Sequence, residues 1–193
     1  MTLEEYDRVV KQKLDHKRYR HCVNVARQAK LLAERYNADK NAAIVAGLLH
    51  DITKQDNSRQ QLQTIQNGAI ILSNVEKRSP NLFHAISGSI YIRQKLGVTN
   101  EDIRNAVRYH TTARAGMSKL EKIIYLADLT SADRDYPDVD QMRAVVLQDL
   151  DEAMRQSLQF IIPDLVRRNL LLHPDTIAAY NEYFSAFQPA VEE

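Results

Sequence analysis

The chain has 193 residues, 44% hydrophobic and 26% charged, which is enough for one substantial globular domain. Its 26 basic and 25 acidic residues nearly cancel, which argues against binding nucleic acid or an anionic membrane through bulk charge. The one cysteine, Cys22, excludes an internal disulfide and makes a cysteine-ligated metal site implausible.

The amino-terminal segment MTLEEYDRVV lacks the basic start and the continuous apolar core of a signal peptide. No apolar run approaches the roughly 20 residues that a membrane-spanning helix needs. We therefore expect a cytoplasmic protein that binds neither membrane nor nucleic acid.

Apolar residues recur mostly at spacings of three and four, and glycine and proline are scarce, which predicts an all-α chain. Thr2 and Glu5 resemble a capping box ahead of the first helix. A second helix is expected over about 17–36 and a third after Asp39. The polar segment 55–68 is compatible with a marginal helix or with a mobile segment.

Helical periodicity continues through the rest of the chain, and no segment alternates as a strand would. We predict a single compact domain over residues 1–187, followed by a disordered tail over 188–193. A helix over 81–96 is expected to stop at Gly97, and one over 100–110 to begin at a capping pair of Thr99 and Asp102. Another helix is expected after the capping box of Ser118 and Glu121. A long helix over 139–160 is expected to end or kink near Pro163, and a last helix to run from Pro174 to about 187.

Six histidine and aspartate side chains fall on the buried faces or at the ends of five predicted helices. Any one of them could be a core side chain bonded to backbone, but an unpaired buried carboxylate costs several kcal/mol. Their common placement therefore favours one shared metal centre. Imidazole with carboxylate favours zinc, iron, manganese, cobalt or nickel over calcium or magnesium. The six candidate ligands are His21, His50, Asp51, His84, His110 and Asp128.

The order of these motifs resembles the HD-domain metal-dependent phosphohydrolases, and within them the YqeK family. The resemblance covers roughly residues 5–160. It implies an all-helical HD-domain bundle with a metal site at its centre and two divalent transition-metal ions, iron being expected. The stretches that carry it are RYRH (18–21), HDITK (50–54), HAISG (84–88), YHTT (109–112), EKIIYLAD (121–128) and DRDYP (133–137), followed by Val139 and Arg143.

The resemblance also implies a reaction, the symmetrical hydrolysis of diadenosine tetraphosphate to two ADP. Two metals would share a water, lower its pKa and so provide hydroxide for in-line attack on phosphorus. Asp51 would fix the metal pair and orient the nucleophile. The implied ligands are His21, His50, Asp51 and Asp128 for one metal, and His84 and His110 for the second, with Asp51 bridging.

Cationic side chains are expected to neutralise the leaving nucleoside diphosphate. Lys54 lies one helical turn after Asp51, so it is expected to act beside it in catalysis. Ala113 with Arg114, and the segment LTSA after Asp128, depart from the family pattern where substrate preference would be set. The expected substrate contacts are Arg18, Lys54, Thr111, Thr112, Arg114 and Arg134.

Other functions remain open from the sequence. A nucleoside mono- or triphosphate phosphohydrolase of the same superfamily could use the same residues. A non-catalytic nucleotide or metal sensor belongs to a different class, and a purely structural bundle would tolerate His50→Ala and Asp51→Ala. A GYP segment, which cyclic-dinucleotide phosphodiesterases of the HD-GYP type need, is missing. The sequence does not decide whether the chain forms a homodimer.

Overall fold

The structure is a computed structural model that describes residues 1–185, and every regular element among them is helical. The predicted boundary at 187 and the predicted tail over 188–193 lie outside the described residues. The helices are α1 (Leu3–Lys13), α2 (His16–Arg35), α3 (Lys40–Leu49), α4 (Ser58–Asn67), α5 (Asn74–Lys77), the 3₁₀ helix η1 (Pro80–Leu82), α6 (Phe83–Leu96), α7 (Glu101–Tyr109), α8 (Lys119–Thr130), α9 (Val139–Val146), α10 (Leu150–Arg167) and α11 (Pro174–Ser185).

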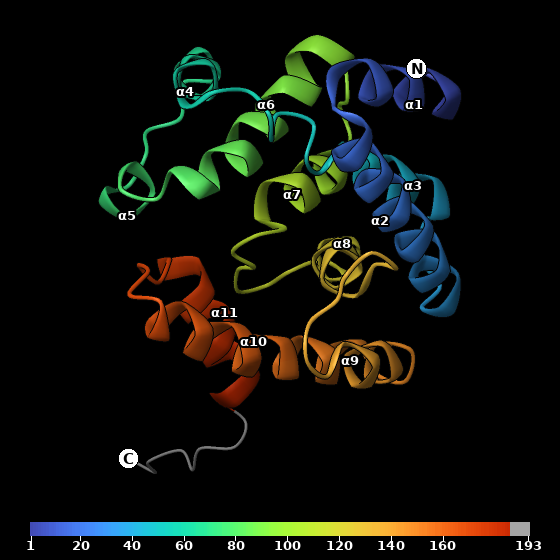
Figure 1. Cartoon of the computed structure of the whole chain (residues 1–193), viewed down its shortest axis with the longest axis vertical. Helices are drawn as coiled ribbons and strands as arrows, with labels where there is room; N and C mark the ends of the chain where they lie inside the picture. The colour runs from blue at the N-terminus through green and yellow to red at the C-terminus, as the bar shows by residue number, and fades with distance from the viewer. Residues whose placement is uncertain (186–193) are drawn as a thin grey trace.

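Figure 1 shows α7 and α8 in the middle of the fold, with α1 to α3 on one side and α4 to α6 on another. Helices α9 to α11 form a layer beneath α8. One hydrophobic cluster runs from Tyr6 in α1 to Ala179 in α11, so helices far apart in sequence share a core. A smaller cluster between α4 and α6 includes Ile65 and Phe83. Within residues 1–185, no helix is both long and apolar enough to cross a bilayer.

Side-chain caps fix where the helices that carry the candidate ligands begin. Asp39 caps α3, as predicted, by accepting from the first free backbone N–H groups of that helix. The predicted capping boxes at Thr2 and Ser118 are both present at the starts of α1 and α8. These caps set the register of α3 and α8, so that His50 and Asp51 follow directly after α3 and Asp128 lies in the last turn of α8.

The polar segment 55–68 is a helix, α4, rather than an irregular segment. Asn57 and Gln60 form a capping box at its start. Ile65 is buried in the smaller hydrophobic cluster, and the Gln61 side-chain amide donates to the Thr53 carbonyl at 2.7 Å. Two tertiary anchors therefore compensate for the weak periodicity of this segment.

The predicted start of α7 is wrong by one residue. Asn100, not Thr99, is the cap, because its side-chain oxygen accepts from the backbone N–H groups of Asp102 and Ile103. The Asp102 carboxylate accepts instead from the hydroxyl of Ser118. The cap of α8 and the first turn of α7 are thereby joined.

The predicted single helix over 139–160 is two helices, α9 and α10. Of the two outcomes expected near Pro163, an end or a kink, the end is wrong. Asp149 interrupts the run and caps α10, which continues to Arg167. Pro163 and Gln159, whose carbonyl loses its helical partner, are both exposed, so water can bond that oxygen. A proline on the solvent side therefore does not end this helix.

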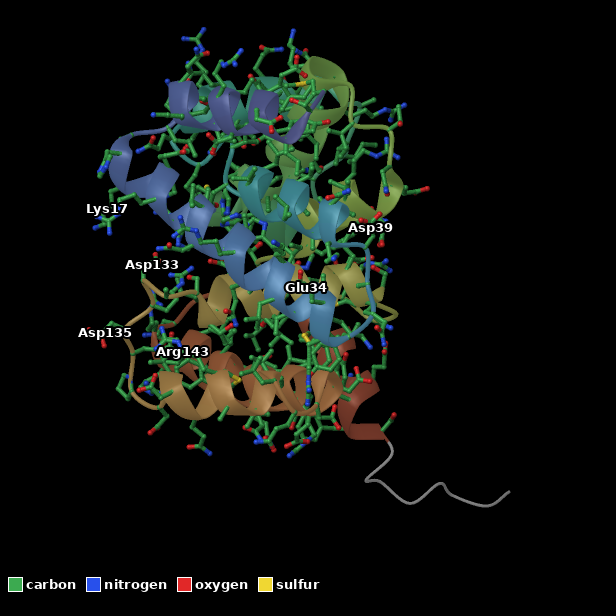
Figure 2. All side chains as sticks on the ribbon, turned by 90° about the vertical axis from the view of Figure 1, so that its right-hand side faces the viewer. Lys17, Glu34, Asp39, Asp133, Asp135 and Arg143 are labelled. Carbon is green, nitrogen blue, oxygen red and sulfur yellow. The ribbon has the colours of Figure 1, made fainter. Side chains whose placement is uncertain are left out.

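Helices α2 and α3 approach each other closely at Gly47. A Cβ placed there would lie 2.7 Å from the Cα of Ala26, a backbone atom that cannot move alone. Figure 2 shows the two helices side by side, with Glu34 and Asp39 near the connection between them. The Gly47 carbonyl also accepts from Nδ1 of His50 at 2.7 Å, so this glycine sets both the helix spacing and the direction of that ring.

We predict that Gly47→Ala lowers the free energy of unfolding by about 2–3 kcal/mol, because the added methyl group forces α3 away from α2. Urea denaturation measures this change. The control is Gly116→Ala, where φ is 64° but no neighbouring heavy atom lies within 4 Å of the new Cβ. Only the left-handed conformation opposes that methyl group, at about 1 kcal/mol. Equal losses in the two variants would contradict the steric argument.

Candidate metal centre

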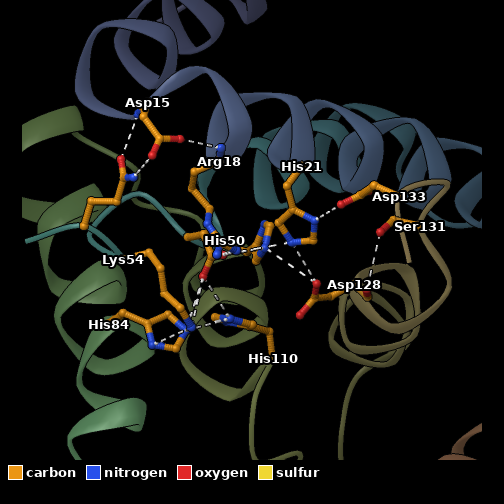
Figure 3. Close-up of polar contacts among 12 residues, drawn as sticks. Asp15, Arg18, His21, His50, Lys54, His84, His110, Asp128, Ser131 and Asp133 are labelled. Carbon is orange, nitrogen blue, oxygen red and sulfur yellow. Dashed lines mark hydrogen bonds and ion pairs between the residues drawn. The ribbon is translucent and has the colours of Figure 1, made fainter. Parts of the chain in front are cut away.

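The six side chains predicted as ligands meet where α2, α3, α6, α7 and α8 come together (Figure 3). Five of them are buried, and the sixth, Asp128, has a side chain 19% exposed. Three overlapping triads within the set have ligand atoms that all lie within 4.8 Å of one another. The set comprises His21 on α2, His50 and Asp51 directly after α3, His84 in the first turn of α6, His110 directly after α7, and Asp128 in the last turn of α8.

The carboxylate of Asp51 lies between two pairs of imidazoles. Its Oδ1 is 3.2 Å from Nε2 of His84 and 3.7 Å from Nε2 of His110. Its Oδ2 is 3.5 Å from Nε2 of His50 and 4.0 Å from Nε2 of His21. Each oxygen therefore faces its own pair of rings, which is the arrangement of a bridging carboxylate.

Asp128 adds a second carboxylate, which lies closest to His21 and His50. Its Oδ1 lies 3.0 Å from Nε2 of His21 and 3.9 Å from Nε2 of His50. The side with His21 and His50 thus has two carboxylates, and Asp128 also reaches toward His110, since ligand atoms of His50, His110 and Asp128 all lie within 4.8 Å of one another.

Two of the rings are fixed in one tautomer by the helices they end. Nδ1 of His50 donates to the Gly47 carbonyl at 2.7 Å, and Nδ1 of His110 donates to the Val107 carbonyl at 2.8 Å. A carbonyl only accepts, so Nδ1 carries the proton in each neutral ring. The lone pair of Nε2 then points into the cluster, as metal coordination requires.

His21 is oriented by a residue that sequence reasoning missed, Asp133. Oδ2 of Asp133 lies 2.8 Å from Nδ1 of His21, and the Asn24 amide donates to Oδ1 at 3.0 Å. Burial raises the pKa of Asp133, but the His21 hydrogen bond outweighs this and holds it below its ordinary value. Asp133 lies in a loop without periodicity, so only its place in the DRDYP tract could have indicated it.

The cluster holds two of its groups, Asp51 and His84, in protonation states that bind metals. Burial alone would raise the pKa of Asp51, but the neighbouring His50 and His110 hold it well below the ordinary value. Burial lowers the pKa of His84 well below its usual range, and the charges of His110 and Lys54 add to this. An ionised carboxylate and a neutral imidazole are the forms that coordinate divalent cations. Burial alone would lower the pKa of His50, but the neighbouring Asp51 and Asp128 outweigh it and raise that pKa.

Three buried atoms of the cluster have no hydrogen-bond partner: Nε2 of His21, Nε2 of His50 and Oδ1 of Asp51. Leaving such atoms unpaired costs about 1–3 kcal/mol each. Two imidazole nitrogens and a carboxylate oxygen that converge on one region suit transition-metal ions. The residues present therefore fit divalent metals.

Basic side chains form the solvent-facing rim above these buried ligands. Nη1 of Arg18 donates to Oδ2 of Asp51 at 2.7 Å, and Nζ of Lys54 lies 3.9 Å from Oδ1 of Asp51. The guanidinium of Arg134 bonds the carboxylate and the carbonyl of Asp128. The three basic side chains are 33–38% exposed, against 6% or less for the four histidines. Negative groups arriving from solvent would meet these cations first.

A cavity of about 260 Å³ adjoins the cluster. Its polar groups include the Thr111 and Tyr136 hydroxyls, both buried and without hydrogen-bond partners. Leu129 and Ile161 add an apolar surface. The lining residues are His110, Thr111, Tyr125, Asp128, Leu129, Arg134, Tyr136 and Ile161.

Four of the six residues predicted to contact substrate do not line this cavity: Arg18 and Lys54, which lie on the basic rim, and Thr112 and Arg114. Arg114 makes a bidentate ion pair with the buried Glu121, with N···O distances of 2.6 and 2.7 Å. Thr112 uses its carbonyl to accept from the Thr176 hydroxyl of α11 at 2.7 Å. Thr112 therefore joins the segment after α7 to α11, and Arg114 ties the same segment to the first turn of α8.

The HD domain family model matches residues 18–133, a range that includes all six clustered side chains. The chain belongs to the HD-domain family. Phosphohydrolases of this family bind divalent metals, and the His/Asp cluster is the place in this HD domain that suits them.

Similar HD-domain proteins match nearly the whole chain. A symmetrical bis(5'-nucleosyl)-tetraphosphatase from Bacillus subtilis (strain 168) is 38% identical, covering 94% of this chain and 97% of its own. One of the same name from Halalkalibacterium halodurans is 36% identical over 90% and 92% of the two chains. A crystal structure from Clostridium acetobutylicum, described as a predicted HD superfamily hydrolase involved in NAD metabolism, has a TM-score of 0.93 and 33% identity, and covers 96% of this chain and 98% of its own.

We predict that Asp133→Asn weakens the binding of divalent metal about 10- to 100-fold, because His21 loses the carboxylate that orients its ring. Competition with a chelating dye for Mn²⁺ or Co²⁺ measures the affinity. Asp135→Asn is the matched control, since Asp135 is an exposed aspartate on the same loop (Figure 2). Equal affinities in the two variants would show that Asp133 does not support the site.

Proposed function

We propose that this chain is a symmetrical bis(5'-nucleosyl)-tetraphosphatase that cleaves diadenosine tetraphosphate into two ADP. The observation that carries the proposal is the carboxylate of Asp51, whose two oxygens each face a separate pair of imidazoles within 4.0 Å. The names of the two relatives, which match at least 90% of this chain, support the choice of substrate.

The proposed cofactors are two divalent transition-metal ions, with iron first and manganese, cobalt, nickel or zinc as alternatives. When bound, such a pair supplies Lewis acidity, which acidifies water and neutralises charge on phosphate oxygens. The orphaned buried atoms of His21, His50 and Asp51 support this proposal. The proposed ligands are His21, His50, Asp51 and Asp128 on one side, and Asp51, His84 and His110 on the other.

The basic rim would bind and orient the polyphosphate. Arg18 and Arg134 are suited to phosphate oxygens because a guanidinium offers parallel N–H donors. Lys54 offers a point charge beside Asp51 and would neutralise the leaving diphosphate as its P–O bond breaks. Burial lowers the pKa of the Lys54 amine, and Asp51 opposes that shift.

The cavity beside the cluster would receive one nucleoside of the substrate. Thr111 and Tyr136 would donate their unpaired hydroxyls, and Ile161 would pack against the base. Asp51, held ionised, would keep the ligand set in place. Water oxygen then joins one central phosphorus, the bond from that phosphorus to the shared central oxygen breaks, and each product is a nucleoside diphosphate.

Product analysis tests the proposed reaction directly. After anaerobic incubation with ferrous iron and diadenosine tetraphosphate, we expect ADP as the only nucleotide product. AMP together with ATP would contradict symmetrical cleavage. Faster turnover of nucleoside mono- or triphosphates than of the dinucleotide would replace the proposal by the phosphohydrolase alternative. Metal binding without any turnover would favour a sensor.

We predict that Lys54→Met lowers kcat about 100-fold, a loss of about 3 kcal/mol in transition-state stabilisation, because the leaving diphosphate loses a cation. Steady-state kinetics on the iron-loaded protein measures it. The control is Lys40→Met, which removes a lysine 57% exposed and paired only at the surface with Glu34. A raised KM with unchanged kcat would limit Lys54 to ground-state binding.

A homodimer and a cytoplasmic location remain predictions.

A further inference from the structure

A second cleft, of about 310 Å³, opens between the end of α4 and helices α6 and α7. Arg93, Arg104 and Arg108 line it, and we call it the arginine cleft. At about 100° per residue, Arg93 lies roughly 180° around α6 from His84. The arginine cleft therefore uses a different face of α6 from the one that contributes to the metal centre.

One wall of the arginine cleft is held by close packing. A Cβ on Gly68, at the end of α4, would lie 2.6 Å from Cδ1 of Ile90 on α6. The Gln94 amide donates to the Asn67 carbonyl at 3.3 Å and ties the same two helices together. The shape of the cleft thus follows from contacts that do not involve its arginines.

Two of the three arginines of the cleft have no acidic partner among the described residues. No aspartate or glutamate is among its lining residues. Arg108 bonds the buried Glu76 at 2.6 Å, whereas within residues 1–185 no side-chain hydrogen bond or ion pair engages Arg93 or Arg104. Nε of Arg104 is buried without an acceptor. A buried guanidinium N–H without a partner loses the bonds it had to water, and nothing in this part of the chain replaces them.

We propose that the arginine cleft binds the phosphate or diphosphate group of a small molecule. Guanidinium groups match phosphate oxygens in geometry as well as in charge. Asn105 and Tyr109 also line the cleft and add neutral donors. A volume of about 310 Å³ is at the lower end of the range for small-molecule sites, which suits a ligand no larger than a nucleotide. The proposal does not rest on the activity of the metal centre.

Calorimetric titration with pyrophosphate tests the proposal on the full chain carrying Asp51→Asn, in which the metal centre is disabled. We expect one pyrophosphate site at the arginine cleft, separate from binding at the basic rim, whose Arg18, Lys54 and Arg134 this variant keeps. Arg93→Gln and Arg104→Gln should each weaken it about tenfold or more, because each removes a charge-assisted hydrogen bond. Lys95→Gln, which removes an exposed cation from α6 outside the cleft, should leave it unchanged. Thermal melts establish that each variant is folded.

A second titration, with ADP, distinguishes a nucleotide site from a site for inorganic phosphate groups. ADP binding more tightly than pyrophosphate would define a nucleotide site, and equal affinities a phosphate site. The absence of pyrophosphate binding at millimolar concentration, or equal weakening by Lys95→Gln, would overturn the proposal. Affinity for single-stranded RNA that exceeds the affinity for pyrophosphate and rises with length would also overturn it. If Asp51→Asn does not fold, the titration is made with metal-loaded protein that keeps Asp51. The wild-type chain should then bind pyrophosphate at two sites, and the double variant Arg93→Gln with Arg104→Gln at one.

Discussion

The arrangement of the candidate metal centre depends on one buried carboxylate. Asp51 is 2% exposed and has four imidazole nitrogens within 4.0 Å. An ionised carboxylate in the protein interior is stable only when its charge is compensated and its oxygens are bonded. Here its two oxygens face different pairs of rings, so one residue joins both halves of the cluster. The basic rim and the neighbouring cavity are arranged around it.

Two of the rings are oriented by the same kind of hydrogen bond at a helix end. His50 and His110 each follow directly after their helix, and each donates Nδ1–H to the carbonyl three residues earlier. That hydrogen bond satisfies a carbonyl left free at the helix terminus and turns Nε2 toward Asp51. Gly47 supplies one of these carbonyls and also allows α3 to approach α2. Helix packing and ring orientation are thus set by the same few atoms.

Much of the cluster could be predicted because helical periodicity reports which side chains face inward. His21 shares a face with Val25, and His110 shares one with Val107, so burial followed from spacing. The structure brings all six of those side chains together. Asp133 was not predicted as a residue of the site because it lies in a loop, where no periodicity exists, and its partner His21 is 112 residues away.

Contacts and exposure that exist only in the folded chain explain other differences. Arg114 seemed free for substrate, yet Glu121 becomes its buried partner only when the chain folds. Pro163 suggested a helix end, but its exposed position lets α10 continue. The four-residue helix α5 was not predicted, although Ser73 and Glu76 have the spacing of a capping box, and Glu76 is also paired with Arg108. Local pattern sets the helices, while these pairings depend on the folded arrangement.

The central claim, that Asp51 joins two metal sites, is tested most directly by counting bound metal. Elemental analysis after anaerobic reconstitution with ferrous iron and removal of free metal should give two ions per wild-type chain. His84→Gln with His110→Gln should retain one, and Asp51→Ala should retain none. Equal metal contents in wild type and Asp51→Ala would contradict the account, as would a wild-type chain that keeps no metal at all.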